Sequence, residues 1–214
     1  MISLVEAKHR VADIRQEISV LGGEHVQIIA VTKSFPSEAM RVAIASDCDG
    51  IGENYAQELL AKSKDLPIGA QVHFIGALQT NKIRQIAPFV HCWQSVDRTS
   101  VIAEIAKRSP GARILLQVNT TGEESKSGVT AVGLDQLRTL ADSAGLKVEG
   151  LMTIGPTDGS DQDCEVAFSQ LRSLVDAHGL AVCSMGMSED FGIAVQCGST
   201  MIRIGRRLFG ERAS

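Results

Sequence analysis

Apolar residues follow two alternating patterns along the chain. Residues 2–20 carry apolar side chains at helical spacing, which predicts an amphipathic N-terminal helix that stops at two consecutive glycines. The continuous apolar run 26–32 follows and is rich in branched residues, so we expect it to form the first strand. Lys33 stands at the carboxyl end of this run.

The same alternation of apolar runs and helical patterns continues to the end of the chain. Pro36 and Ser37 predict the start of a helix, capped by Ser37, that extends to about Ala45. Further strands are predicted near residues 50–52, 71–75, 91–95, 113–118, 147–153, 181–184 and 201–204. Further helices are predicted near residues 54–64, 80–87, 98–108, 130–144, 161–178 and 188–197. Each of the eight strands is therefore followed by a helix or at least a helical stub.

Regular alternation of strand and helix requires parallel strands joined by right-handed crossovers. With eight strands, the pattern favours an α/β fold: a single (β/α)8 TIM-type barrel with an extra N-terminal helix, in one domain over residues 1–214. An open doubly wound sheet is the rival architecture, and it usually carries a glycine fingerprint after its first strand. Residues 32–36 hold Thr-Lys-Ser-Phe-Pro at that position, which favours the barrel.

Composition and charge narrow the possible partners. Hydrophobic residues make up 44% of the chain and aromatic residues only 4%, so the core must be mainly aliphatic, as buried parallel strands prefer. The net charge is −4, from 21 basic and 25 acidic residues. The one local basic cluster is too small to bind a polynucleotide, so no nucleic acid partner is expected. It consists of Arg203, Arg206, Arg207 and Arg212.

The sequence also predicts where the protein works. The N-terminal segment carries charges throughout and lacks the apolar core of a signal peptide. No apolar run reaches the ~18–20 residues that span a bilayer, so we expect no membrane partner and a cytoplasmic location. The five cysteines are odd in number and none are spaced as CxxC, which argues against a disulfide framework and a zinc site. We expect these thiols to be buried and inert.

Reactive and charged residues follow the predicted strand ends, and a barrel gathers its strand ends on one face. Lys33 is the most informative of them. A lysine against an apolar strand is costly to bury in its charged form, and a neutral amine forms a Schiff base with an aldehyde. A lysine that extends from a strand end into solvent is the alternative.

Two segments near the C-terminus predict a phosphate site. In residues 184–190, Ser188 can cap the following helix and turn its hydroxyl toward an anion. In residues 201–210, Gly205 lets backbone amides approach a phosphate, and Arg203 alternates with apolar neighbours so that its guanidinium enters the barrel mouth. Barrels commonly bind phosphate through the loops after strands seven and eight. The alternatives are a plain helix cap for Ser188 and a salt bridge across the rim for Arg203.

A lysine, a phosphate cradle and an arginine for a pyridine nitrogen together make a pyridoxal 5′-phosphate (PLP) site. Segments over nearly the whole chain add to this pattern: AVTKSFP (30–36), IGENYAQEL (51–59), HFIGALQTNKIR (73–84), QVNTTGEESKSGV (117–129), GLMTI (150–154) and SMGMSEDFGIAVQCGSTMIRIGRRLFGER (184–212). Through these segments the chain resembles the pyridoxal phosphate homeostasis protein family, which is similar to the N-terminal barrel domain of alanine racemase.

The resemblance implies a fold-type III barrel in which Lys33 forms the Schiff base with PLP. It implies that Arg203 faces the pyridine nitrogen and keeps it unprotonated, which weakens the ring as an electron sink. It assigns the phosphate to Ser188, Gly205 and the backbone of Arg206, and it places Asn54 and Met152 beside the ring. Lys126 is either a second amine that receives or releases cofactor or a solvated loop lysine.

One departure from the racemases bears on function. Alanine racemases add a C-terminal β domain that supplies a tyrosine base, whereas the only tyrosine here is Tyr55 and the chain ends soon after the predicted barrel. Two-base racemisation needs an acid or base on each side of the reacting carbon. The primary hypothesis is therefore vitamin B6 homeostasis, in which a monomer buffers PLP or delivers it to apo-enzymes with little or no turnover. A racemase-like PLP enzyme and an aldolase-like barrel are the alternatives.

Overall fold

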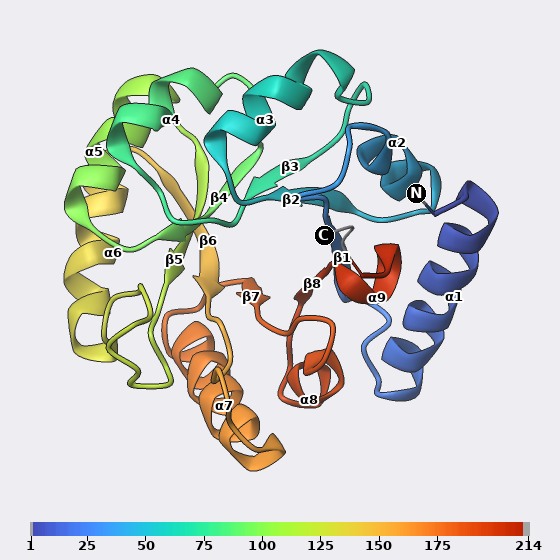
Figure 1. Cartoon of the computed structure of the whole chain (residues 1–214). Coiled ribbons are helices and arrows are strands. Elements are labelled where there is room, and N and C mark those ends of the chain that lie inside the picture. The colour runs from blue at the N-terminus through green and yellow to red at the C-terminus, as the bar shows by residue number, and fades with distance from the viewer. Residues whose placement is uncertain (1, 212–214) are drawn as a thin grey trace.

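Eight short parallel strands pair in chain order and close into a barrel, as the sequence predicts (Figure 1). The computed structural model describes residues 2–211. Closure depends on β1, which pairs with β2 on one side and with β8 on the other. The strands are β1 (Gln27–Val31), β2 (Gly50–Glu53), β3 (Val72–Phe74), β4 (Cys92–Val96), β5 (Arg113–Gln117), β6 (Lys147–Met152), β7 (Val182–Ser184) and β8 (Met201–Ile204).

Helices alternate with the strands and form the outer ring (Figure 1). They are α1 (Leu4–Val20), α2 (Glu38–Ala45), α3 (Ala56–Lys62), α4 (Thr80–Ile86), α5 (Thr99–Arg108), α6 (Leu134–Ser143), α7 (Asp161–Ala177), α8 (Phe191–Gln196) and α9 (Arg206–Phe209). The helix predicted over 130–144 is a 3-10 turn followed by α6, and the helix predicted over 188–197 starts only at Phe191. α9 is a single turn, too short to show a helical period in the sequence.

The prediction that the Ser37 side chain caps α2 is wrong. Ser37 occupies the N-cap position, but its backbone is helical and its side chain makes no capping hydrogen bond. A full capping box forms instead at α7, where Ser160 Oγ accepts from the amide of Asp163 and the Asp163 carboxylate accepts from the amide of Ser160. A serine before a helical pattern therefore indicates where a helix begins, but not which group satisfies its first amides.

Aliphatic side chains fill the space between the strands and the outer helices, as the low aromatic content predicts. The inside of the barrel is partly polar. An apolar cluster of Cys92, Leu115 and Met152 occupies one part of it. Buried polar side chains on four strands occupy another part, and they are His73, Gln94, Ser184 and Arg203. Because TIM barrels usually fill this space with branched aliphatic residues, the polar set calls for a specific explanation.

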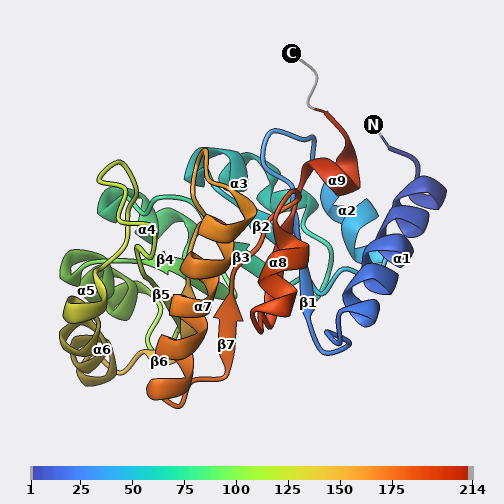
Figure 2. The ribbon, with the colours of Figure 1, turned by 90° about the horizontal axis from the view of Figure 1, so that it is seen from below.

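All eight strands point toward one face of the molecule, and the loops that follow them gather there (Figure 2). The extra N-terminal helix α1 packs against α9 beside that face. Arg10 Nη1 donates to the carbonyl oxygen of Leu208 at 3.0 Å, and Glu17 forms an ion pair with Arg207. Helix α1 therefore holds in place the turn that follows β8.

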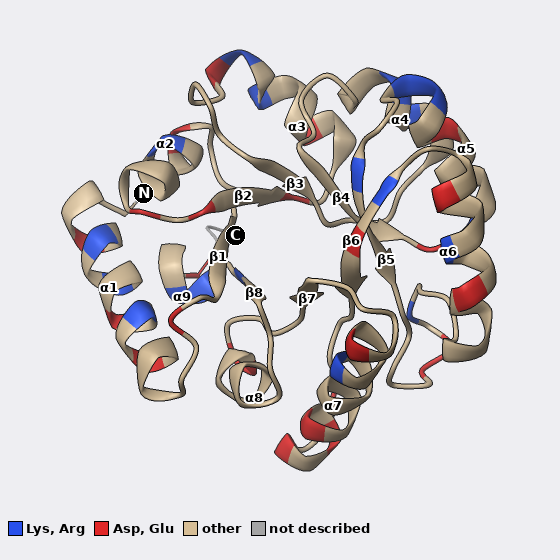
Figure 3. Ribbon diagram, turned by 180° about the vertical axis from the view of Figure 1, so that it is seen from behind, with Lys and Arg blue, Asp and Glu red and all other residues tan. Residues whose placement is uncertain are grey.

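Acidic and basic residues are interspersed over the outer helices (Figure 3). Of the basic cluster noted in the sequence, Arg212 lies outside the described residues, while Arg206 and Arg207 pair with Glu189 and Glu17. These pairs further weaken the case for a polynucleotide partner. Within residues 2–211, no helix combines the length and apolar character needed to cross a bilayer.

Close packing of β6 against β7 makes Gly150 a sensitive position. A Cβ at Gly150 would overlap the carbonyl oxygen of Val182 on the neighbouring strand. We expect Gly150→Ala to lower the free energy of unfolding by roughly 3 kcal/mol, as overpacking against backbone does. Gly192→Ala in α8 is the matched control, because its Cβ would lie 3.8 Å from Leu21 Cδ1 and alanine favours a helix. Urea denaturation measures both, and equal stabilities of the two variants would contradict the strand packing described.

Candidate functional site

A cavity of about 470 Å³ opens where the strands end. It is lined from the ends of β1, β2, β6 and β8 and from the loops after β5, β6 and β7. Every residue that the sequence analysis assigned to a cofactor site lies on its wall, namely Lys33, Asn54, Met152, Ser188, Arg203, Gly205 and Arg206. Lys126 also lies there. The structure thus brings together residues from opposite ends of the chain, and their roles remain predictions.

The strand end that carries Lys33 is fixed by a buried ion-pair cluster. Thr32 Oγ1 donates to Glu53 Oε1 at 2.7 Å, and the ammonium of Lys62 donates to the carbonyl oxygen of Thr32 at 2.8 Å. The same ammonium pairs with Glu53 at 2.8 Å and with Glu58 at 2.6 Å. All three N–H donors of Lys62 therefore have an acceptor, which a buried lysine requires.

The residue after Lys33 is held by the same cluster. The amide of Ser34 donates to Glu58 Oε1 at 2.6 Å, and Ser34 has a left-handed backbone with φ of 63°. A non-glycine residue in this region costs free energy, so the surrounding contacts must hold it. Both neighbours of Lys33 are thus bonded to one cluster, which fixes the direction in which the Lys33 side chain leaves the strand.

Glu53 directly precedes Asn54 at the end of β2, but only Asn54 lines the cavity. Glu53 is fully buried behind the strand end, where burial raises its carboxyl pKa and the hydrogen bonds from Lys62 and Thr32 oppose that rise. The sequence analysis did not identify Lys62 as a residue that supports the site. The one signal for it in the sequence is the spacing of Glu58 and Lys62, four residues apart on a predicted helix.

Arg203 is buried at the floor of the cavity, with 4% of its surface exposed. Its Nη1 donates to Ser184 Oγ and its Nη2 donates to the carbonyl oxygen of Thr153, each at 2.7 Å. Both acceptors are neutral. Burial lowers the pKa of Arg203 to about 10, and the nearby charge of Asp190 acts in the opposite direction. The guanidinium thus remains a cation at neutral pH and can donate to an acceptor in the cavity. The alternative for Arg203, a salt bridge across the rim, does not occur among the described residues.

Ser188 does not cap the helix that follows it. Helix α8 begins after Asp190, and Ser188 Oγ accepts instead from the backbone amides of Gly205 and Arg207, each at 3.3 Å. These amides lie at the turn after β8, so the hydroxyl and the turn form one cradle at the cavity wall. A Cβ on Gly205 would meet only Val31, at an ordinary contact distance of 3.5 Å. Packing within the protein therefore does not demand glycine there, whereas a ligand close to the backbone would.

Asn54, just after β2, and Met152, at the end of β6, also line the cavity. Met152 is 1% exposed and packs on Cys92 and Leu115 inside the barrel. Asn54 Oδ1 is buried and has no hydrogen-bond partner within the described part of the chain. A buried acceptor without a hydrogen bond lowers the stability of the fold, so a ligand that donates to Asn54 Oδ1 would recover that free energy.

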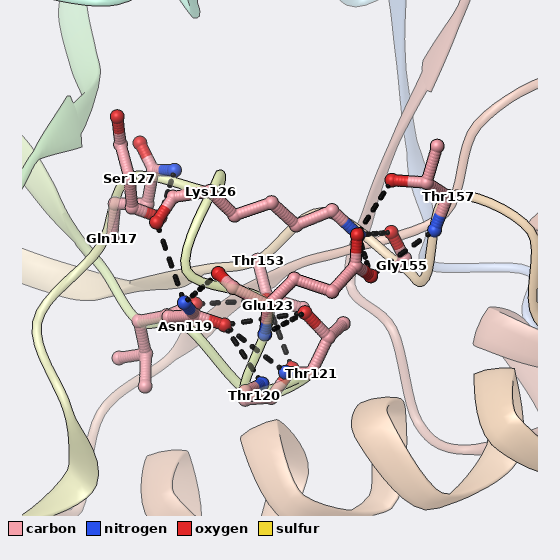
Figure 4. Close-up of polar contacts among 12 residues, drawn as sticks. Gln117, Asn119, Thr120, Thr121, Glu123, Lys126, Ser127, Thr153, Gly155 and Thr157 are labelled. Carbon is pink, nitrogen blue, oxygen red and sulfur yellow. Dashed lines mark hydrogen bonds and ion pairs between the residues drawn. The ribbon is translucent and has the colours of Figure 1, made fainter.

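Lys126 takes part in a polar clasp between two cavity loops (Figure 4). Its Nζ donates to Glu123 Oε1 at 2.6 Å and to the carbonyl oxygen of Gly155 at 2.5 Å. Glu123 also accepts from Thr157 Oγ1 at 2.7 Å. The hydrogen bonds from Lys126 and Thr157 lower the pKa of Glu123 to about 2. Lys126 is therefore an ion-paired residue of the cavity rim, and the reading as a freely solvated loop lysine is wrong.

The cysteines match the expectation of buried thiols. All five are free, and four of them are buried. Burial raises the pKa of Cys48, Cys92 and Cys183 to about 12, so these three stay protonated at neutral pH and are poor nucleophiles.

Removal of Lys62 should destabilise the protein strongly. Lys62→Met leaves the fully buried carboxylate of Glu53 without its cation, and breaking a buried pair in this way costs about 3–5 kcal/mol of unfolding free energy. Lys107→Met on the exposed face of α5 is the matched control and should leave stability unchanged. Chemical denaturation of both variants tests this, and a loss below about 1 kcal/mol for Lys62→Met would show that the cluster is not a significant constraint.

Comparison with known proteins places the chain in a family. The family model for the alanine racemase N-terminal domain matches residues 2–213. A pyridoxal phosphate homeostasis protein of Pseudomonas aeruginosa is 38% identical over 94% of this chain and 92% of its own. The structure of PipY of Synechococcus elongatus with PLP bound is 30% identical, with a TM-score of 0.82 over 95% of this chain and 100% of that one.

Alanine racemase from Streptomyces coelicolor is only 17% identical, with a TM-score of 0.76 over 97% of this chain and 58% of that one, and it shows the shared barrel fold alone. The match to the family model over residues 2–213 and the close relatives agree with each other. The chain therefore belongs to the family of the alanine racemase N-terminal domain and, within it, to the pyridoxal phosphate homeostasis proteins.

Proposed function

We propose that this protein binds PLP covalently through Lys33 and serves in intracellular vitamin B6 homeostasis, with little or no catalytic turnover. The observation that carries the proposal is that one cavity joins the Lys33 side chain, the buried guanidinium of Arg203 and the cradle of Ser188 and Gly205. The names of the relatives and the PLP-bound structure of PipY support the same cofactor.

The residues present fit this cofactor part by part. PLP brings an aldehyde, a phosphate and a pyridine nitrogen when it is bound. Lys33 would supply the amine that holds the aldehyde as a Schiff base, with release of water. Ser188, Gly205 and the backbone of Arg206 would hold the phosphate oxygens at the turn after β8. Asn54 and Met152 bound the space on either side of the ring.

The chemistry of Arg203 supports the proposal of low turnover. Its guanidinium has only N–H donors and stays charged, because its pKa of about 10 is well above neutral pH. It therefore donates to the pyridine nitrogen without giving up a proton. A ring whose nitrogen is not protonated accepts electrons weakly, so carbanion chemistry at a bound amino acid gains little from it.

The cavity also lacks a good candidate for a second catalytic base among the described residues. Lys126 is held as an ammonium between Glu123 and the carbonyl oxygen of Gly155, and an ion-paired ammonium is a poor base. Tyr55 lines a neighbouring cavity instead of this one. The remaining role for a reversible covalent site is storage of PLP or its transfer to apo-enzymes. We expect a cytoplasmic monomer, in keeping with the sequence.

The covalent link is tested by absorbance and borohydride reduction. Incubation with PLP should give a near-visible band that borohydride abolishes, with the added mass on Lys33. Lys33→Ala should lack the band, whereas Lys126→Ala should keep it, because its amine is not the proposed anchor. A protein that stays colourless with excess PLP would overturn the proposal, and a band that survives in Lys33→Ala would assign the link to another amine.

Hydrogen exchange on a small amino acid tests the lack of turnover. In deuterated buffer, the loaded protein should wash out the α-hydrogen of alanine no faster than free PLP does, because Arg203 weakens the electron sink. A parallel assay should detect transfer of PLP to an apo-enzyme. Exchange well above the free-cofactor rate would favour the racemase-like alternative and contradict the homeostasis role.

A further inference from the structure

Four buried polar side chains cross the inside of the barrel in series. Arg203 Nη1 contacts Ser184 Oγ at 2.7 Å, and Ser184 Oγ contacts Gln94 Oε1 at 2.7 Å. Gln94 Nε2 contacts His73 Nδ1 at 2.8 Å. None of the four is more than 4% exposed. They come from β8, β7, β4 and β3, so the series joins opposite walls of the barrel.

Arg203 and the Gln94 amide together fix the direction of the bonds in this series. A guanidinium has no acceptor, so Ser184 Oγ must accept from it. The Gln94 amide turns its oxygen toward Ser184 Oγ, which donates to it, and its nitrogen toward His73 and Met201 Sδ. The other end of the Gln94 amide is then an N–H donor, and His73 Nδ1 must accept from it. The imidazole of His73 consequently carries its hydrogen on Nε2.

The far end of the series reaches a second, smaller cavity. His73 lines a space of about 40 Å³ at the amino ends of the strands, together with Gln27, Gln71 and His91. His73 is 3% exposed, and its Nε2 has no partner among residues 2–211. Burial lowers the pKa of His73 to about 3, so the ring is neutral at physiological pH. A space of this size has room for at least one water molecule, and the polar part of its lining can hydrogen-bond to it.

We infer that Ser184, Gln94 and His73 are positioning residues that hold Arg203 as a fixed donor at the floor of the cofactor cavity, and that the series ends on an internal water bound to His73 Nε2. The link to the cofactor rests on the proposed function. An unsupported arginine side chain has many rotamers, and Thr153 holds only one of its terminal nitrogens. Ser184 holds the other, and Gln94 fixes the Ser184 hydroxyl as an acceptor toward Arg203.

The series itself is tested without cofactor. Nitrogen-15 NMR of the imidazole in the cofactor-free protein should find His73 in the Nε2–H form, with Nδ1 accepting. Gln94→Met removes the donor at similar volume and should convert the ring to a mixture of forms. Gln117→Met is the matched control, because Gln117 is also buried in a strand but donates to Ser127 O, outside the series. An Nδ1–H ring in the unaltered protein would overturn the inference.

The effect on the cofactor site is tested by spectroscopy. Gln94→Met and Ser184→Ala should each shift the absorption band of the PLP-loaded protein and its pH titration, while Gln117→Met should not. Ser184→Thr retains a hydroxyl and should restore the unaltered spectrum, which a merely structural defect would not allow. Unchanged spectra in both Gln94→Met and Ser184→Ala would overturn the positioning role. If His73 is in the Nε2–H form but the protein never binds PLP, the hydrogen-bonded series stands and only the proposed function is rejected.

The internal water is tested by crystallography of the cofactor-free protein at a resolution that orders buried waters. A water within hydrogen-bond distance of His73 Nε2 is the expected result, and an empty or apolar-filled space there would overturn that end of the inference.

Discussion

Pairing of the first strand with the last is the constraint on which the site depends. β1 and β8 run side by side, with Ile29 opposite Arg203 and Ala30 opposite Ile204. Lys33, just past β1, and the turn after β8 therefore share one edge of the cavity, although they are far apart in the sequence. Helix α1 reinforces the closure, since it binds α9 through Arg10 and Leu208. A chain in which this pairing failed would have neither a closed barrel nor a complete cofactor wall.

The two most buried cations near the site, Lys62 and Arg203, differ in the groups that contact them. Lys62 is matched by two carboxylates, and all of its donors are used in holding the strand end that bears Lys33. Arg203 is held only by neutral oxygens, so its charge is not cancelled within the described contacts. A buried cation without a carboxylate is costly in a low-dielectric interior, and a ligand acceptor would lower that cost. The first cation therefore has a structural role, while the second is suited to a ligand.

The sequence predicts more of the fold than of the internal chemistry. Strand positions follow from apolar runs, and the common face follows from parallel order, so the residues past the strand ends could be grouped correctly. Lys62 and Gln94 could not be found in this way, because their roles depend on which side chains meet inside the structure. Gln94 contacts residues 21 and 90 positions away, and no local pattern encodes such distances. Ser188 lines the cavity as the sequence predicts, but its partners lie on the turn after β8 and are not local in sequence.

The proposed reversible storage and the proposed weak catalysis depend on the same arrangement of side chains. An imine on Lys33 would return to amine and aldehyde by addition of water, so release would need no further chemistry. A catalyst would need an acid or base that changes its protonation during the reaction, whereas Arg203 stays charged at neutral pH and Lys126 is bound in an ion pair with Glu123. Fixed donors of this kind would hold a bound ring without activating it. The clasp of Lys126 and Glu123 links the loops after β5 and β6, so it restrains two of the segments that enclose the cavity.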